Sequence, residues 1–214
     1  DLYLNHGFSR SLVLGVGVEG GRNTVDFPTP DQSMVQANGH LRFTPNQRFS
    51  LDVIAGAEVR TFDNIARESF TTPVFSIAAT WLPVDSTRFI FGATRQVFNS
   101  ASRTAQDTRG NVVVLGQDYV DTNLSGTIRE RICQQLYFIV IGGYEHVEYF
   151  KAIDLPISLL ETTDDYFYVQ PSVDLLLTSF WSVGGYYLRR ENSGSIPTVG
   201  FYSNEYGVRM SIKF

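Results

Sequence analysis

The chain of 214 residues is 43% hydrophobic and 14% aromatic, and its 17 Lys and Arg against 22 Asp and Glu give a formal net charge of -5. This composition excludes a disordered chain, because apolar residues are plentiful and net charge is small, and it argues against a nucleic-acid partner, since there is no basic excess to neutralise phosphates. The single cysteine, Cys133, excludes an internal disulfide framework and a cysteine-cluster zinc site, and no run of 18 apolar residues is present to form a transmembrane helix.

Apolar and polar residues alternate with a period of two along most of the chain. A strand sorts such a pattern onto two faces, whereas a helix would spread it around its circumference. We therefore expect an all-β protein with strands near residues 9–20, 33–43, 48–61, 72–82, 88–98, 119–131, 136–149, 166–178, 180–190 and 204–214. In 88–98, 136–149 and 180–190 both faces carry aromatics or glycines, so the alternation does not assign their facing.

The connections between these segments alternate in length. Tight connections near 44–47, 83–87, 133–135 and 178–179 are separated by long polar stretches at 21–32, 62–71, 99–118, 150–165 and 191–203. An up-and-down antiparallel meander gives this pattern when all tight turns lie at one end and all long loops at the other. Transmembrane β-barrels have this anatomy.

Aromatic residues gather near both ends of the expected strands. Amphipathic rings favour the level of the lipid headgroups, so two aromatic girdles are expected in a bilayer, although large rings also fill the cores of soluble sandwiches. The girdle at the short-turn end is expected to include Phe43, Phe49, Trp81 and Trp181, and the aromatics towards the long-loop end are Phe62, Phe98, Tyr119, Tyr149, Tyr166 and Tyr187.

The polar face of the strands is rich in amides and small hydroxyl residues and poor in lysine. A soluble barrel would turn its polar face outward, whereas in a membrane barrel the same face lines the interior. The residue types on this face favour a wet lumen, which we expect to be lined by Gln36, Asn38, His40, Arg42, Asp52, Glu58, Arg60, Asp121, Asn123, Arg129, Gln170, Asp174 and Arg209.

The charges on this face allow two interpretations. They can filter solutes in an open channel, or they can neutralise one another and plug a narrow barrel. Width decides between them, because about eight strands leave an interior filled by side chains and roughly 16 to 18 leave an aqueous channel. About ten strands are visible here, which form either a complete small barrel or part of a larger one.

The end of the chain resembles the C-terminal strand of bacterial outer-membrane barrel proteins. Those proteins finish on Phe with apolar residues at every second position upstream, as do Tyr206, Val208, Met210, Ile212 and Phe214. The resemblance implies that this segment is the signal bound by the outer-membrane assembly machinery.

Three further stretches resemble the β-barrel porin family. They are Trp81-Leu82-Pro83 continuing to Phe98-Asn99-Ser100, then Gly142-Gly143-Tyr144, and then Gly184-Gly185-Tyr186. The likeness covers most of the chain through loose strand-like patterns and implies an outer-membrane barrel, without naming a solute. Members of that family are longer, and Leu2-Tyr3-Leu4 followed by Asn5-His6-Gly7 is typical of a strand entering a short turn. We therefore expect residues 1–214 to be a single barrel domain that lacks N-terminal strands.

No pattern of residues predicts catalysis or a cofactor. The three histidines, His6, His40 and His146, lack metal-ligand spacing, and Glu145 and Glu148 would point to opposite faces of a strand. Ser33, Ser50 and Asp52 lie near His40 in the sequence, but this proximity does not make a triad. We expect no enzyme activity, no metal and no cofactor.

The sequence thus predicts a porin-like channel in the bacterial outer membrane for passive diffusion of small polar solutes. The alternative is a barrel that exports a surface polymer or acts as a membrane-embedded scaffold of a larger assembly. The expected partners are outer-membrane lipid, the assembly machinery and a homo-oligomer or larger envelope complex, and no nucleic acid.

Overall fold

The protein folds into one large antiparallel sheet, seen in a computed structural model that describes residues 2–24, 31–63, 69–98, 103–106, 112–115, 119–149, 163–194 and 200–212. The strands in chain order are β1 (Leu2–Gly7), β2 (Leu12–Asn23), β3 (Gln32–Asn46), β4 (Phe49–Phe62), β5 (Phe70–Val84), β6 (Thr87–Phe98), β7 (Arg103–Gln106), β8 (Val112–Leu115), β9 (Tyr119–Arg131), β10 (Leu136–Tyr149), β11 (Thr163–Leu176), β12 (Trp181–Gly194) and β13 (Phe201–Ile212).

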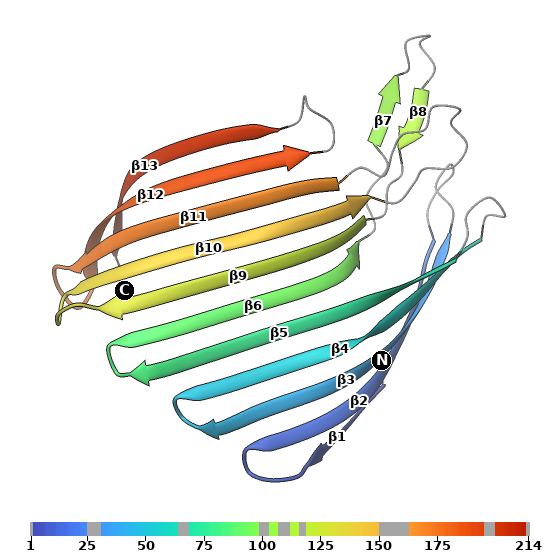
Figure 1. Ribbon diagram of the computed structural model, residues 1–214, viewed down its shortest axis with the longest axis horizontal. Coiled ribbons are helices and arrows are strands. Elements are labelled where there is room, and N and C mark those ends of the chain that lie inside the picture. The colour runs from blue at the N-terminus through green and yellow to red at the C-terminus, as the bar shows by residue number, and fades with distance from the viewer. Residues whose placement is uncertain are drawn as a thin grey trace.

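The expected all-β, up-and-down antiparallel arrangement is confirmed. Eleven strands form one curved sheet in sequence order, and β7 and β8 form a separate hairpin at the long-loop end (Figure 1). All ten expected strands are present, and β1 adds an eleventh. His6, which we expected in a turn, lies instead in β1, and the chain turns at residues 8–11. Across the residues described, no helix is long and apolar enough to span a membrane.

The alternation of short and long connections is also confirmed. Five short turns join β1 to β2, β3 to β4, β5 to β6, β9 to β10 and β11 to β12, all at one end of the sheet (Figure 1). In three of them the backbone N–H of the first turn residue donates to the carbonyl four residues later: Phe8 to Leu12 at 3.0 Å, Ile132 to Leu136 at 3.0 Å and Leu177 to Trp181 at 2.9 Å.

Strand register gives the sheet two chemically different faces. Register partners share a face, so Gln36 and Glu58 lie together on one side, and Val35 and Val59 lie together on the other. The second side exposes large apolar residues, including Val35 at 56% and Val208 at 81%. The polar side of β1–β6 is hollowed by a cavity of about 350 Å³. The polar side is therefore the concave, inner face, and the apolar side is the outer face.

Several inner-face glycines make room for a large side chain on the neighbouring strand. Gly143 faces Tyr168 across β10 and β11, and a Cβ added to this glycine would lie 2.5 Å from Tyr168 Cε1. Gly207 faces Tyr186 in the same way across β12 and β13. Each ring fills the space above a residue without a side chain, which pins the register of the strand pair.

The two edges of the sheet, β1 and β13, show no pairing with each other among the described residues. Both strands run from the long-loop end to the short-turn end, so a direct pairing between them would be parallel. An all-antiparallel closure needs an odd number of further strands between these edges, in agreement with the even strand number of bacterial single-chain barrels.

Candidate functional site

The candidate site is the inner face of the sheet. All 13 residues that we expected to line a lumen occupy this face, as the strand register shows. β3 pairs Gln36 with Glu58 and Arg42 with Asp52, and the expected residues of β9, β11 and β13 lie in other rows of the same face. Their common facing is a structural fact.

A buried ion pair lies near the long-loop end of this face. Glu58 and Arg60 are two residues apart on β4, and the side chain of each is only 4% exposed. Arg60 Nη2 lies 2.6 Å from Glu58 Oε1, and Gln32 Oε1 accepts a 3.4 Å hydrogen bond from Arg60 Nη1. Both charged residues line the 350 Å³ cavity, together with Gln36 and Asn38. The charges nearest this hollow are therefore already neutralised.

A second polar cluster lies near the short-turn end of β3 and β4. Arg42 Nε donates a 2.9 Å hydrogen bond to Asp52 Oδ2. His40 Nε2 lies 3.3 Å from Asp52 Oδ1, and its other ring nitrogen is 3.2 Å from Asn5 Oδ1. Both ring nitrogens thus have partners, and neither partner is a serine hydroxyl.

Towards the β13 edge of the sheet, on the same inner face, Arg209 and Asp174 form another ion pair. Arg209 Nη2 donates a 2.6 Å hydrogen bond to Asp174 Oδ2 and a 3.3 Å bond to Ser172 Oγ. Gly184, the register partner of both charged residues, provides the space in which they meet.

The remaining expected residues are spread along the wall of the sheet. The guanidinium of Arg129 on β9 lies 4.3 Å from the ring centre of Tyr137 on β10, which is its diagonal neighbour in register. Asp121, Asn123 and Gln170 occupy separate rows. In the described part of the chain, Asp121 Oδ1 is buried without a hydrogen-bond partner.

The inner face also carries polar residues that the sequence pattern did not predict. Arg190 Nη2 donates a 3.3 Å hydrogen bond to Glu205 Oε2, and the hydroxyl of Tyr186 donates to Glu205 Oε1 at 2.7 Å. Glu145 also lies on this face, since it pairs in register with Asn123. Three of these four residues belong to segments whose facing the alternation left unassigned. The glycines that face tyrosines could have supplied the missing signal.

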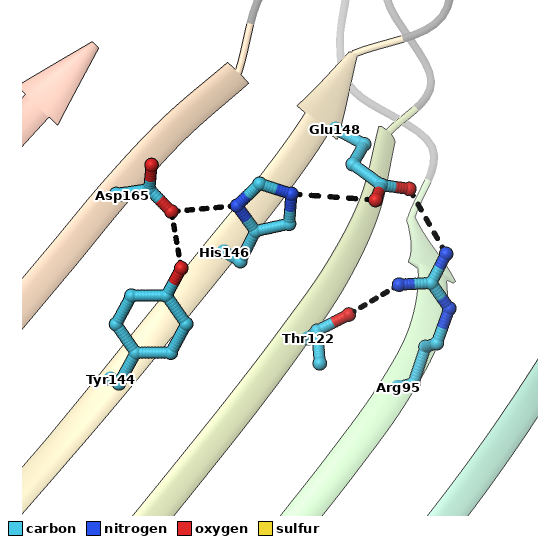
Figure 2. A network of polar contacts seen from close by, with 6 residues as sticks. All are labelled: Arg95, Thr122, Tyr144, His146, Glu148 and Asp165. Atoms are coloured by element: carbon cyan, nitrogen blue, oxygen red, sulfur yellow. Dashed lines mark hydrogen bonds and ion pairs between the residues drawn. The ribbon is translucent and has the colours of Figure 1, made fainter.

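A polar network lies on the outer face of β6, β9, β10 and β11 (Figure 2). Register places it there, because Arg95 pairs with Thr122, and Thr122 with His146, in rows that alternate with the inner-face rows. We call these residues the outer-face network: Arg95, Thr122, Tyr144, His146, Glu148 and Asp165.

The outer-face network links four strands, from β6 to β11. Arg95 donates to Thr122 Oγ1 at 2.6 Å and to Glu148 Oε2 at 2.9 Å. His146 lies between two carboxylates, 3.3 Å from Glu148 and 2.7 Å from Asp165 (Figure 2). These contacts confirm the expectation that Glu148 and Glu145 face opposite sides, and they use both nitrogens of the His146 ring.

The expected short-turn girdle residues all lie on the outer face. Phe43 and Phe49 meet edge to face with ring centres 6.2 Å apart, and Trp81 stacks on Phe89 at 5.4 Å. Trp181 pairs in register with Ile212 on the same face. Their position at the headgroup level of a membrane remains a prediction.

The described residues of the expected assembly signal also point outward. Tyr206, Val208, Met210 and Ile212 are exposed by 79%, 81%, 63% and 45%. Phe214 lies outside the described residues. Recognition of this strand by the assembly machinery remains a prediction.

The aromatics near the long-loop end require a correction. We expected them to form a second lipid-facing girdle, but five of the six lie on the inner face, and only Tyr187 faces outward. Phe98, Tyr119 and Tyr149 are register partners on rows that alternate with the outer-face network. Strand ends on both faces can carry aromatics, so proximity to a loop could not assign the face.

The described residues contain no cluster of three His, Cys, Asp or Glu side chains suited to a metal ion. The glycine-rich stretch at 15–21 lies within β2 and forms no phosphate-binding loop.

Comparison with solved structures gives distant likenesses to outer-membrane proteins. No protein-family description and no curated protein matches the sequence. OmpT, an outer-membrane protein of Vibrio cholerae in its trimer form, is similar over 98% of this chain and 82% of its own, with 8% identity and a TM-score of 0.38. The CymD monoaromatic hydrocarbon channel is similar over 99% of this chain and 81% of its own, with 9% identity and a TM-score of 0.30. A Pseudomonas aeruginosa FadL homologue is similar over 97% of this chain and 75% of its own, with 11% identity and a TM-score of 0.31. All three TM-scores are below 0.5, so these likenesses carry no argument for the function of this chain.

Proposed function

We propose that the protein is a porin-like channel of the bacterial outer membrane, through which small polar solutes diffuse passively along a lumen of mixed charge. The observation that carries the proposal is the division of the sheet into an apolar, exposed outer face and a polar, hollowed inner face. A soluble sheet that exposed so many large apolar side chains would associate or precipitate, whereas hydrocarbon accommodates them.

The ion pairs on the inner face support a channel of mixed charge. Arg60, Arg190 and Arg209 are each paired with a carboxylate on the same face. Paired charges keep the wall polar while adding little net potential. We therefore expect weak selectivity between small cations and anions.

Conductance across planar bilayers tests this proposal. The full-length protein, reconstituted at low density in potassium chloride, should give stepwise and long-lived open currents. A protein that inserts into the bilayer but carries no current would contradict the channel. Insertion is checked independently by co-flotation of the protein with liposomes.

The outer-face network favours a second candidate, a homo-oligomer or membrane-embedded scaffold. Glu148 and Asp165 are 42% and 39% exposed, next to the exposed apolar side chains of Leu124 and Phe167. Charged side chains are costly against lipid, and a mixture of polar and aromatic groups is typical of protein interfaces.

A double substitution tests this second candidate. The variant Arg95→Leu/Glu148→Leu removes the Arg95–Glu148 ion pair from the patch, so it should dissociate an oligomer that uses the network while leaving a lipid-facing wall intact. Light scattering in mild detergent measures the mass. An unchanged mass in the wild type and the variant would overturn the interface.

A further inference from the structure

An arc of aromatic side chains follows the inner face near the long-loop end. It comprises the residues that we expected in a lipid-facing girdle, except Tyr187, and two more that the register adds. We call this set the aromatic collar: Phe62, Phe70, Phe98, Tyr119, Tyr149, Tyr166 and Phe201.

The rings of the collar contact one another across neighbouring strands. Ring centres are 6.0 Å apart for Phe62 and Phe70, and 5.4 Å apart for Phe98 and Tyr119. Tyr119 continues the row to Tyr149 at 5.7 Å.

Towards the β13 edge of the sheet, on the same inner face, the ring centres of Tyr166 and Phe201 are 6.3 Å apart across β12, and Asn192 lies between them in register. Phe98 and Phe201 are 39% and 47% exposed, so these two rings are not covered by the fold. The collar therefore presents accessible ring surface on a face that is otherwise polar.

The chemistry around the collar selects among possible ligands. The nearest inner-face arginines, Arg60 and Arg190, are already paired with Glu58 and Glu205, so they offer no free cation for an anion. Asp121 lies two residues beyond Tyr119 on the same face, and its carboxylate would repel an anionic ligand. Hydroxyl and amide groups, from the collar tyrosines and from Asn192, remain as hydrogen-bonding partners.

We propose that the aromatic collar is a binding site for neutral carbohydrate, where a sugar ring stacks its C–H face on the aromatic rings and its hydroxyls bond the surrounding polar groups. This inference deepens the proposed channel by naming the class of solute that it would take. The physical basis is that an aromatic face is electron-rich and attracts the weakly positive C–H groups of a flat, uncharged ring. A charged solute would gain the stacking but lose hydration without a counter-charge.

Isothermal titration of the full-length protein in detergent micelles tests the collar independently of conductance. The probe is maltotriose. Sorbitol serves as a polyol without a ring, and 4-hydroxybenzoate as an anionic ring. The variant Phe98→Leu removes one collar ring but keeps apolar bulk, and its matched control, Phe89→Leu, removes a ring from the outer face of the same strand.

Maltotriose should bind the wild type and Phe89→Leu alike and bind Phe98→Leu about 2- to 10-fold more weakly, as expected for one lost aromatic contact. Sorbitol should bind far more weakly than maltotriose. Tyr119→Leu replaces Phe98→Leu if the latter does not fold by circular dichroism. Absence of maltotriose binding, equal binding by both phenylalanine variants, or preference for 4-hydroxybenzoate would each overturn the proposal. Since the assay needs no current, a silent bilayer would contradict only the channel.

Discussion

At the scale of single residues, we expect substitution within the buried Glu58–Arg60 pair to lower the free energy of unfolding. Both side chains are 4% exposed, so the protein environment has replaced most of their water. The variant Glu58→Gln keeps the shape of the side chain but removes the carboxylate charge that lies 2.6 Å from the buried guanidinium of Arg60. We expect the free energy of unfolding to fall by about 3–5 kcal/mol, measured by urea unfolding in lipid vesicles.

The chain contains a matched control for this substitution. Glu191 pairs with Arg189, also two residues away on one strand, but their side chains are 50% and 45% exposed. Glu191→Gln should therefore cost about 0–1 kcal/mol. Equal losses in the two variants would show that burial does not govern the Glu58–Arg60 pair.

The sequence could predict the face of these residues but not their partners. The alternation of apolar and polar residues within each strand predicts that Asp174 and Arg209 lie on the polar face, because facing depends only on the period of two in that strand. Their contact depends on which rows of β11, β12 and β13 align, and on Gly184 leaving space between them. The link between Arg95 and Glu148 likewise spans β9, which no local pattern reveals.

At the scale of strands, glycine positions explain where sequence alternation failed. In β10, Gly143 lies on the inner face where periodicity would favour a side chain, because the ring of Tyr168 occupies that space. The residue that completes the face belongs to the next strand. Hydrophobic periodicity within one strand cannot show that a side chain from the neighbouring strand covers a glycine.

This arrangement predicts opposite outcomes for two glycines on neighbouring strands. Gly143→Ala should lower the free energy of unfolding by about 1–3 kcal/mol, because the new methyl group meets the Tyr168 ring. Gly126→Ala on β9, where an added Cβ meets nothing within 4 Å, should be neutral or stabilising by about 0.4–1 kcal/mol. Urea unfolding of both variants measures the difference, and similar values would contradict the packing role of Gly143.

At the scale of the whole molecule, both boundaries of the outer apolar band slope in the same direction across the sheet. At the long-loop boundary, the charged residue of β6 is Arg95, and the row of register partners that begins at Arg95 reaches Ser193 in β12. The charged residue of β12 at the same boundary is Arg189, which lies nearer the short turns than Ser193. At the short-turn boundary, the aromatic residue of β6 is Phe89, and its row of register partners reaches Pro171 in β11. The aromatic residue of β12 at the same boundary is Trp181, which pairs with Ile212 in a row nearer the short turns. Tilted strands in a barrel give this result, since register rows run obliquely to the membrane.

The two faces of the sheet are expected to have different surroundings: water at the inner face and lipid at the outer face. Single cysteines along β3, introduced in a Cys133→Ser background and reconstituted in liposomes, test this expectation most directly. A membrane-impermeant charged maleimide should label positions 36, 40 and 42 readily and positions 35, 37 and 41 slowly, in strict alternation. Uniform labelling, or faster labelling of the odd positions, would contradict the account.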